Sequence, residues 1–284
     1  MAVRKFKPTT STRRTTRLAD RSMLEKDGGP KSLTIAKKQK SGRNNQGKIT
    51  VRHRGGGFKR RIRIVDFNRR DKFGIPAKVT GLYFDPNRTA HLALLLYADG
   101  ERRYIIAPKG LKVGDTVIAG EKTDLLPGNA MLIKNIPSGT EVNSVENVPG
   151  NGAVFGRSAG QVIVVQGIDP TGKYVQIKMP SGEIRLVFAD SIATVGQVSN
   201  EENLHVKLGK AGRRRNLGWR PEVRGMAMHP AEHPHGGGEG KGVIGGPAKD
   251  KWGNLVGTRT RKNRRTEKFI IKTRRTKTRP FAKK

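Results

Sequence analysis

Three histidines lie close together in the last quarter of the chain, and their type and spacing could support chemistry. They are His229, His233 and His235, with two glutamates nearby. Imidazoles at such spacings occur in zinc sites, and imidazole also acts as a general acid or base near neutral pH. Pro230 and Pro234, however, exclude the helix that would place His229 and His233 on one face. Because catalysis also needs a preorganised pocket that this stretch does not predict, we expect the histidines to hydrogen-bond or stack on a nucleic acid.

The histidines are embedded in a glycine-rich, strongly basic stretch. Seven of the eleven residues from Gly236 to Gly246 are glycine. An earlier stretch, residues 52–61, repeats the order of histidine, glycine triplet and basic residues. Glycine lets the main chain lie close against another surface, and flanking cations neutralise phosphates. Both stretches therefore predict contact with a phosphate backbone, whereas a glycine triplet without flanking charge would be a plain linker.

Charge divides the chain into a neutral middle and two basic ends. Residues 1–70 hold 22 basic and 4 acidic side chains, residues 71–209 hold 14 of each, and residues 210–284 hold 22 basic and 5 acidic ones. Such ends repel themselves, so we expect them to become ordered only on a polyanion. A membrane surface fits less well than a nucleic acid, because the basic segments lack apolar residues at helical spacing and no apolar run approaches a membrane span. The absence of cysteine excludes disulfides and cysteine-ligated zinc.

RNA fits the basic ends better than DNA. A reader of duplex DNA presents a helix to the major groove, and no helix with a basic face is evident. Extended arms suit the irregular surface of folded RNA. Trp219 and Trp252 lie in these coreless basic segments, where they either stack on a base or pack back on the protein. Two alternatives stay open: a histidine- or metal-dependent enzyme, and an architectural DNA-binding protein.

The neutral middle predicts two small β-barrels. Five short strands are expected at 61–64, 77–84, 91–97, 102–106 and 113–118, with the isoleucines of Arg61-Ile62-Arg63-Ile64 facing inward and Asp99-Gly100 forming a hairpin turn. This set predicts an OB-fold barrel. A second set, at 130–133, 142–148, 161–166, 174–179 and 184–188, predicts an SH3-like barrel. The fold class is therefore mainly β, with an N-terminal extension at 1–58, barrels at 59–125 and 126–198, and an extended basic tail at 199–284.

Within the arms, the pattern predicts a short helical turn at Asp20–Lys26 and a short strand at Ile49–Val51. No phosphate-binding P-loop, nucleophile elbow or dinucleotide fingerprint is present, so we predict no enzyme and no catalytic residue. We also predict no metal site and no cofactor, apart from Mg²⁺ that accompanies bound RNA. The predicted RNA-binding residues are Arg43, Arg52, His53, Arg54, Gly55, Gly56, Gly57, Lys59, Arg60, Arg61, Arg157, Arg213, Arg214, Arg215, Trp219, Arg220, Arg224, His229, His233, His235, Gly236, Gly237, Gly238, Lys241, Trp252, Arg259, Arg261, Lys262, Arg264 and Arg265.

Several long motifs resemble the universal large-subunit ribosomal protein family "L-two" in its bacterial or organellar form. The resemblance runs in order along the whole chain. The motifs that carry it are Lys5-Phe6-Lys7-Pro8-Thr9, Gly42-Arg43-Asn44-Asn45-Gln46-Gly47, Arg52-His53-Arg54-Gly55-Gly56-Gly57, Tyr83-Phe84-Asp85-Pro86-Asn87-Arg88, Asp99-Gly100-Glu101-Arg102-Arg103-Tyr104-Ile105, Arg157-Ser158-Ala159-Gly160, Ser181-Gly182-Glu183 and Pro221-Glu222-Val223-Arg224-Gly225 through His233-Pro234-His235-Gly236-Gly237-Gly238-Glu239-Gly240. His229 and Asn216 depart from the family, which usually has Asn and, in bacterial members, Trp at these places.

The resemblance implies an OB-fold barrel, an SH3-like barrel and arms that penetrate ribosomal RNA. It implies a structural role in the large subunit, in its assembly, in subunit association and in transfer-RNA binding near the peptidyl-transferase centre. His233 corresponds to the family's noted histidine and would be a supporting residue there, with RNA performing the chemistry. The implied partners are large-subunit ribosomal RNA, neighbouring ribosomal proteins, the small subunit and nearby transfer RNA, with no membrane and no DNA. The implied location is a cytoplasmic ribosome of the bacterial type, or an organellar ribosome.

Overall fold

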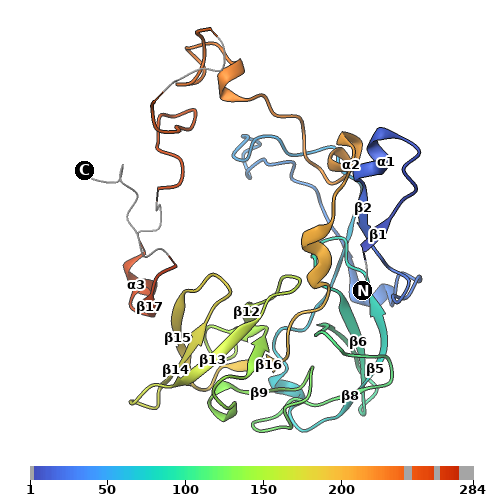
Figure 1. The fold of residues 1–284 in the computed structure, drawn as a ribbon. Helices are drawn as coiled ribbons and strands as arrows, with labels where there is room; N and C mark the ends of the chain where they lie inside the picture. Colours follow the sequence, from blue (N-terminus) through green and yellow to red (C-terminus); the bar gives the residue numbers. More distant parts are fainter. Residues whose placement is uncertain (1–2, 240–244, 259–262, 275–284) are drawn as a thin grey trace. The chain divides into compact units, whose positions relative to one another are not determined.

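The computed structural model describes residues 3–239, 245–258 and 263–274, and the chain divides into two compact units. The barrel unit comprises residues 1–39, 59–213 and 268–274. The loop–tail unit comprises residues 40–58, 214–267 and 275–284. Most elements are short β-strands, which confirms the predicted mainly β class (Figure 1).

The first barrel is built on a four-stranded antiparallel sheet in the order β7-β6-β5-β8. Its strands are β5 (Ala77–Tyr83), β6 (Leu92–Tyr97), β7 (Arg102–Ile106) and β8 (Thr116–Val117). Side chains of β5 alternate between buried and accessible, as expected for one face on a core. Gly100 adopts a φ of 85° in the predicted turn between β6 and β7, which confirms the hairpin.

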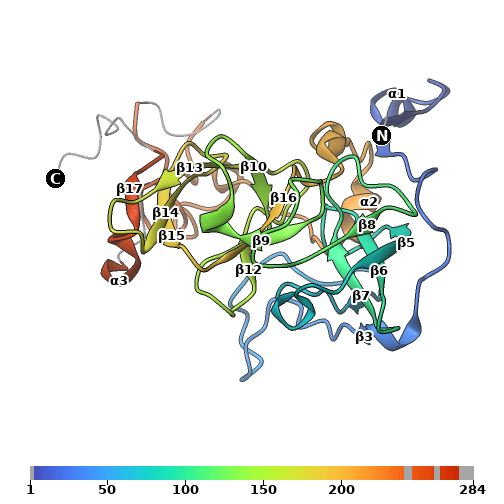
Figure 2. The same ribbon diagram turned by 90° about the horizontal axis from the view of Figure 1, so that it is seen from below.

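The first strand of the predicted set, at 61–64, is not part of this sheet. Strand β4 (Arg61–Arg63) pairs instead with β3 (Thr34–Ala36), and the two form a separate antiparallel ribbon; β3 is labelled in Figure 2. The expectation that Ile62 and Ile64 face inward is wrong, because their exposed fractions are 37% and 47%.

An arginine takes the inward position that the isoleucines were expected to fill. Arg63 Nη2 donates to the carbonyl of Gly28 (3.2 Å), and its guanidinium lies 6.0 Å from the ring centroid of Tyr104. Apolar alternation identifies a strand but not which face lies on the core, and here a carbonyl and an aromatic face receive the arginine.

The second barrel is built on a seven-stranded antiparallel sheet in the order β17-β15-β14-β13-β10-β16-β9. The strands, most of them labelled in Figures 1 and 2, are β9 (Ala130–Leu132), β10 (Glu141–Asn143), β13 (Ile163–Ile168), β14 (Tyr174–Lys178), β15 (Ile184–Phe188), β16 (Ile192–Val195) and β17 (Ile270–Lys272). The predicted strand at 142–148 is interrupted at Ser144, whose φ is 49°. The chain then continues in β11 (Val145–Glu146), which pairs with β12 (Ala153–Phe155). The core of the second barrel contains Val142, Ile163, Val175, Ile177 and Val187.

The two barrels share buried residues. Ala119 of the first barrel forms one apolar cluster with Ala130, Leu132 and Ile192 of the second. Arg69 is 5% exposed, and its guanidinium donates to the carbonyl of Gly128 (3.0 Å) and to Thr194 Oγ1 (2.8 Å). Burial lowers the pKa of Arg69 from its usual value.

A buried carboxylate lies at the same junction of the barrels. Glu146 accepts hydrogen bonds from the backbone N–H groups of Gly152 (3.2 Å) and Ile192 (2.9 Å), and Arg70 lies 3.4 Å away. Loss of this carboxylate would leave two N–H donors without their acceptor.

Short elements interrupt the N-terminal segment that was expected to be extended. Strands β1 (Val3–Lys5) and β2 (Arg17–Ala19) pair around α1 (Ser11–Thr15), whose N-cap is Thr10. The 3₁₀ turn Lys31–Leu33 precedes β3. The expected helical turn at Asp20–Lys26 is a tight turn, with the N–H of Leu24 donating to the carbonyl of Arg21 (3.1 Å).

The described residues of the C-terminal part form two short helices and one strand of the second barrel. The helices are α2 (Ala211–Asn216) and α3 (Arg264–Glu267). Strand β17 was not predicted, and it brings residues 270–272 back to the edge strand β15. Further 3₁₀ turns are at Arg70–Lys72, Ile133–Asn135, Glu201–His205 and Gly225–Ala227. Among the described residues, no helix is long and apolar enough to cross a membrane.

Candidate nucleic-acid interface

The early glycine loop and the basic tail pair with each other inside the loop–tail unit. Arg54 lies opposite Trp219 in an antiparallel bridge. The N–H of Gly55 donates to the carbonyl of Gly218 (2.9 Å), and the N–H of Arg220 donates to the carbonyl of His53 (3.1 Å). The N–H of Phe58 donates to the carbonyl of Asn216 (3.0 Å). Stretches that are about 160 residues apart in the sequence therefore form one backbone-paired element.

The glycine triplet meets two different requirements of this pairing. Gly55 and Gly56 have φ angles of 126° and 66°, which side chains other than glycine rarely allow. Gly57 has no such angle, but a Cβ there would lie 2.8 Å from the backbone N and 2.9 Å from the Cα of Gly218. The triplet was expected to allow close approach of a phosphate backbone, and it also allows close approach of the chain's own tail.

Both tryptophan rings make cation–π contacts with basic side chains of the same chain. The Arg54 guanidinium lies 3.3 Å from the ring centroid of Trp219, and Arg214 lies 5.3 Å from it. Arg52 and Lys251 lie 5.5 and 5.0 Å from the ring centroid of Trp252. Cation–π attraction of this kind orients a guanidinium while its N–H edge keeps its donors.

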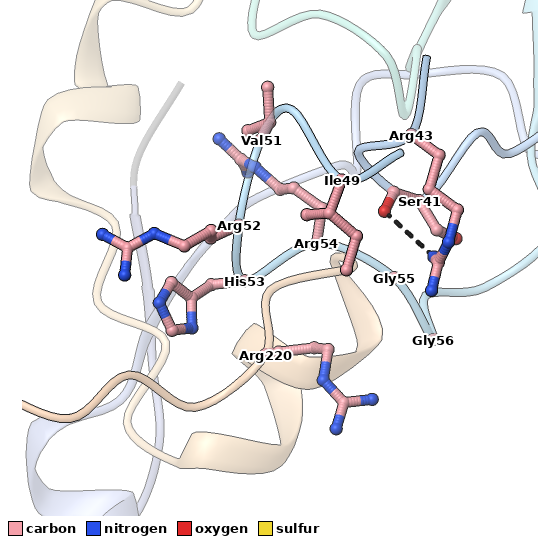
Figure 3. Close-up of a pocket in the computed structure, with 10 residues that line it drawn as sticks. All are labelled: Ser41, Arg43, Ile49, Val51, Arg52, His53, Arg54, Gly55, Gly56 and Arg220. Carbon is pink, nitrogen blue, oxygen red and sulfur yellow. Dashed lines mark hydrogen bonds between the residues drawn. The ribbon is translucent and has the colours of Figure 1, made fainter. Parts of the chain in front are cut away.

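A cavity of about 590 Å³ opens in the loop–tail unit beside this pairing (Figure 3). It is lined by Ser41, Arg43, Ile49, Val51, Arg52, His53, Arg54, Gly55, Gly56 and Arg220. Figure 3 shows the side chains of Arg52 and Arg220 pointing away from each other, so the cations do not converge on one point. Such a cationic surface suits a chain of phosphates better than one small anion.

Two lining residues had no place in the predicted interface. Ile49 and Val51 were expected in a strand; instead, Ile49 makes a single bridge with Arg43. Their exposed fractions are 60% and 51%. Two apolar residues in an otherwise basic loop could have indicated an apolar wall of the cavity. We instead interpreted them as part of a short strand.

His53 is fixed by the tail. It adopts a φ of 59°, and its Nδ1 lies 2.9 Å from the carbonyl oxygen of Pro221. Because a carbonyl only accepts, Nδ1 carries the proton in this contact and Nε2 remains available to a ligand.

The later histidines lie in a compact turn that depends on glycine. The His233 ring packs so closely on Gly225 that a Cβ there would lie 2.4 Å from it. The N–H of His235 donates to His233 Nδ1 (3.0 Å), and His235 Nε2 accepts from the N–H of Lys249 (3.1 Å). The rings of His233 and His235 are 5.1 Å apart. Their ring nitrogens thus help to fold the tail.

The same turn gives no arrangement for metal chemistry. In the described parts of the chain, no group of three or more His, Cys, Asp or Glu side chains is placed to hold a metal ion. His229 is exposed and its Nδ1 accepts from the N–H of Ala231 (3.3 Å). Gly236 permits the turn, because a Cβ there would lie 2.4 Å from the carbonyl oxygen of His229.

The other predicted residues are distributed over both units. Lys59, Arg60, Arg61, Arg157 and Arg213 belong to the barrel unit, whereas Arg215, Arg224, Gly237, Gly238, Arg264 and Arg265 belong to the loop–tail unit. Lys241, Arg259, Arg261 and Lys262 lie outside the described residues. Arg213 has a local role, since it donates to the Leu208 carbonyl (2.6 Å) and to Thr16 Oγ1 (3.2 Å).

Arg103 and Lys72 of the barrel unit pair with carboxylates. Arg103 bonds to Asp66 (3.0 Å), Asp71 (2.6 Å) and Glu101 (2.7 Å), and Lys72 bonds to Glu101 (2.6 Å). Hydrogen bonds from Arg103 and Lys72 lower the pKa of Glu101 to about 2. In the loop–tail unit, by contrast, Arg54 contacts an indole ring and Arg43 a carbonyl (3.4 Å), so these contacts leave the cationic charge in place.

Two small β-barrels joined in the chain to a glycine-rich, cation-bearing loop–tail unit define an RNA-binding protein of the ribonucleoprotein class. Comparison with protein families is more specific. The model "Ribosomal Proteins L2, RNA binding N-terminal domain" matches residues 30–119, and "Ribosomal Proteins L2, C-terminal domain" matches residues 126–253. The chain belongs to the ribosomal protein L2 family, whose members are RNA-binding, non-enzymatic components of the large ribosomal subunit. The barrels are accordingly OB-like and SH3-like.

Proposed function

We propose that this protein is a structural constituent of the large subunit that binds ribosomal RNA through the loop–tail unit. The pairing of Arg54 with Trp219 carries the proposal, because it gathers the arginines of two distant stretches on one element. Cations on a backbone-paired element need less ordering when RNA binds than cations on two separate flexible arms.

The predicted RNA contacts are part of this proposal. Arg43, Arg52 and Arg220 bind phosphates around the cavity, and His53 offers Nε2 to a phosphate or ribose. The remaining predicted residues extend the contact along the tail and onto the barrel unit. Mg²⁺ accompanies the RNA and is not held by the protein.

The resemblance to the family supports the finer roles. These are subunit assembly, association with the small subunit, and transfer-RNA binding near the peptidyl-transferase centre. His233 supports that centre by holding the tail turn, in which its Nδ1 accepts the N–H of His235. The ribosome is of the bacterial type, in the cytoplasm or in an organelle, and the domain limits 1–58, 59–125, 126–198 and 199–284 are proposed on the sequence pattern.

Gradient sedimentation of ribosomes in high salt tests the proposal. The wild-type chain should remain with the large subunit, whereas Arg43→Gln with Arg52→Gln and Arg220→Gln should wash off. A matched control replaces three exposed lysines of the barrel unit, Lys112, Lys122 and Lys173, by glutamine and removes the same charge. Equal loss of both variants would show that charge alone matters, and release of the wild type would contradict an RNA-embedded role.

A further inference from the structure

The ribbon β3–β4 of the barrel unit exposes apolar side chains on its outer face. Ile35 and Ile62 are directly opposite each other, and Ile64 lies two residues further along the same face. Their exposed fractions are 56%, 37% and 47%. A single exposed isoleucine needs no explanation, but adjoining ones on a small ribbon form a patch that marks an interaction surface.

Two cations continue this face. The N–H of Lys37 donates to the carbonyl of Arg60 (3.1 Å), which extends the ladder and places Lys37 opposite Arg60, two residues beyond Ile35 and Ile62. Lys37 Nζ donates to Asn87 Oδ1 (3.1 Å), and Arg60 donates to the carbonyl of Pro86 (3.0 Å). The acceptor of Lys37 is a neutral amide oxygen, so this contact positions Lys37 without cancelling its charge.

The inward face of the ribbon explains why the apolar side chains point outward. Arg63 occupies that face, where it reaches Gly28 and Tyr104. A one-residue shift in register would bury the isoleucines but would turn Arg63 away from both groups. The ribbon therefore holds an apolar strip and a pair of cations side by side at the surface.

We propose that the outer face of β3–β4 docks in the minor groove of a double-helical RNA segment. The isoleucines lie against riboses and base edges, and Lys37 and Arg60 lie beside the phosphates. The minor groove of A-form RNA is wide and shallow, so a two-stranded ribbon fits it, whereas that of B-DNA is only about 6 Å wide. The inference rests on the proposed RNA-binding role and names the form of RNA bound at one surface.

Binding of the full-length protein to a 16-base-pair RNA duplex, and to DNA of the same sequence, tests the inference. Ile35→Thr with Ile62→Thr keeps β-branched side chains, so the ribbon should remain folded. This variant should bind the RNA duplex roughly tenfold more weakly, with an unchanged salt dependence because no cation is lost. Lys37→Gln should instead reduce the slope of log K against log salt by about one. Val113→Thr, at an exposed apolar position elsewhere in the first barrel, is the matched control.

Each outcome decides between distinct conclusions. Unchanged RNA affinity of the double isoleucine variant, or an equal loss on the DNA duplex, would overturn the groove assignment. A photo-crosslinker at position 35 in assembled large subunits should attach to RNA; attachment to a ribosomal protein would show a protein occupant and overturn it too. If the wild-type protein bound no ribosomal RNA, the proposed function itself would fail. The isoleucine and lysine variants test only the groove assignment, so the two failures can be told apart.

Discussion

Replacing Gly57 by alanine should open the pairing between the early loop and the tail. The added Cβ would lie 2.8 Å from the N and 2.9 Å from the Cα of Gly218, and 3.1 Å from the carbonyl oxygen of Asn216. All three neighbours are backbone atoms, so no side chain can rotate away. The two strands must separate, because the contacts are shorter than van der Waals distances.

The size of the effect follows from the interactions that would be lost. Backbone hydrogen bonds from the N–H groups of Gly55, Phe58 and Arg220 join the stretches. At about 1 kcal/mol each, with roughly 0.5–1 kcal/mol for the stacking of Arg54 on Trp219, the pairing contributes about 3–4 kcal/mol. Because 1.4 kcal/mol is a factor of ten, protection of these amides from hydrogen exchange should fall on the order of 100- to 1,000-fold.

Two measurements on the RNA-free protein report the result. Hydrogen exchange follows the three amides, and fluorescence in a Trp252→Phe background follows Trp219, since the chain has two tryptophans. Gly28→Ala is the matched control, because a Cβ there meets nothing within 4 Å and its φ is not in the left-handed region. If Gly57→Ala left both the amide protection and the Trp219 emission unchanged, the loop and the tail would not be paired in the free protein.

Three further predictions concern stability and salt. Burial lowers the pKa of His91 to about 4. As the pH falls, the His91 imidazole is therefore protonated in the unfolded state before it is protonated in the folded state, and the free energy of unfolding should fall by up to about 3 kcal/mol between pH 6.5 and 4. His91→Leu should abolish this loss of stability in denaturation curves. Glu146→Ala should cost about 1–3 kcal/mol for each of the two buried N–H donors that it leaves unpaired, whereas Glu146→Gln, which keeps an oxygen acceptor, should cost less in urea unfolding. Salt should strengthen amide protection in the loop–tail unit, by screening repulsion between its arginines, while it weakens RNA binding; changes of the same sign would contradict this.

The barrels were predictable because their strands follow a period of two and end at recognisable turns. Strands β5 and β15 begin within a residue of where the alternation places them, and the Asp99-Gly100 turn is present. The face of a strand was less predictable. In Arg61–Ile64 the alternation separates arginines from isoleucines but does not say which set faces the core. Only the neighbouring Gly28 carbonyl and Tyr104 ring determine that Arg63 turns inward.

The candidate interface was predictable in its residue types but not in its pairing. Charge and glycine content identified both stretches, because these properties can be read from each stretch by itself. Their contact depends on Gly57 meeting Gly218, and no local pattern carries information about a partner about 160 residues away. Strand β17 escaped prediction for the same reason, because three residues in a basic tail become a strand only by pairing with β15.

The pairing also bears on how Trp219 would contribute to the proposed RNA binding. A base stacks on a free aromatic face, but Arg54 covers one part of the Trp219 ring at 3.3 Å and Arg214 lies 5.3 Å from its centre. Stacking of a base on the face that Arg54 covers would require this arginine to leave, and would displace a cation for which we propose a phosphate contact. We therefore expect Trp219 to act through the arginine that it orients, and its contribution to RNA affinity should appear as a salt-dependent electrostatic effect rather than as a stacking preference for particular bases.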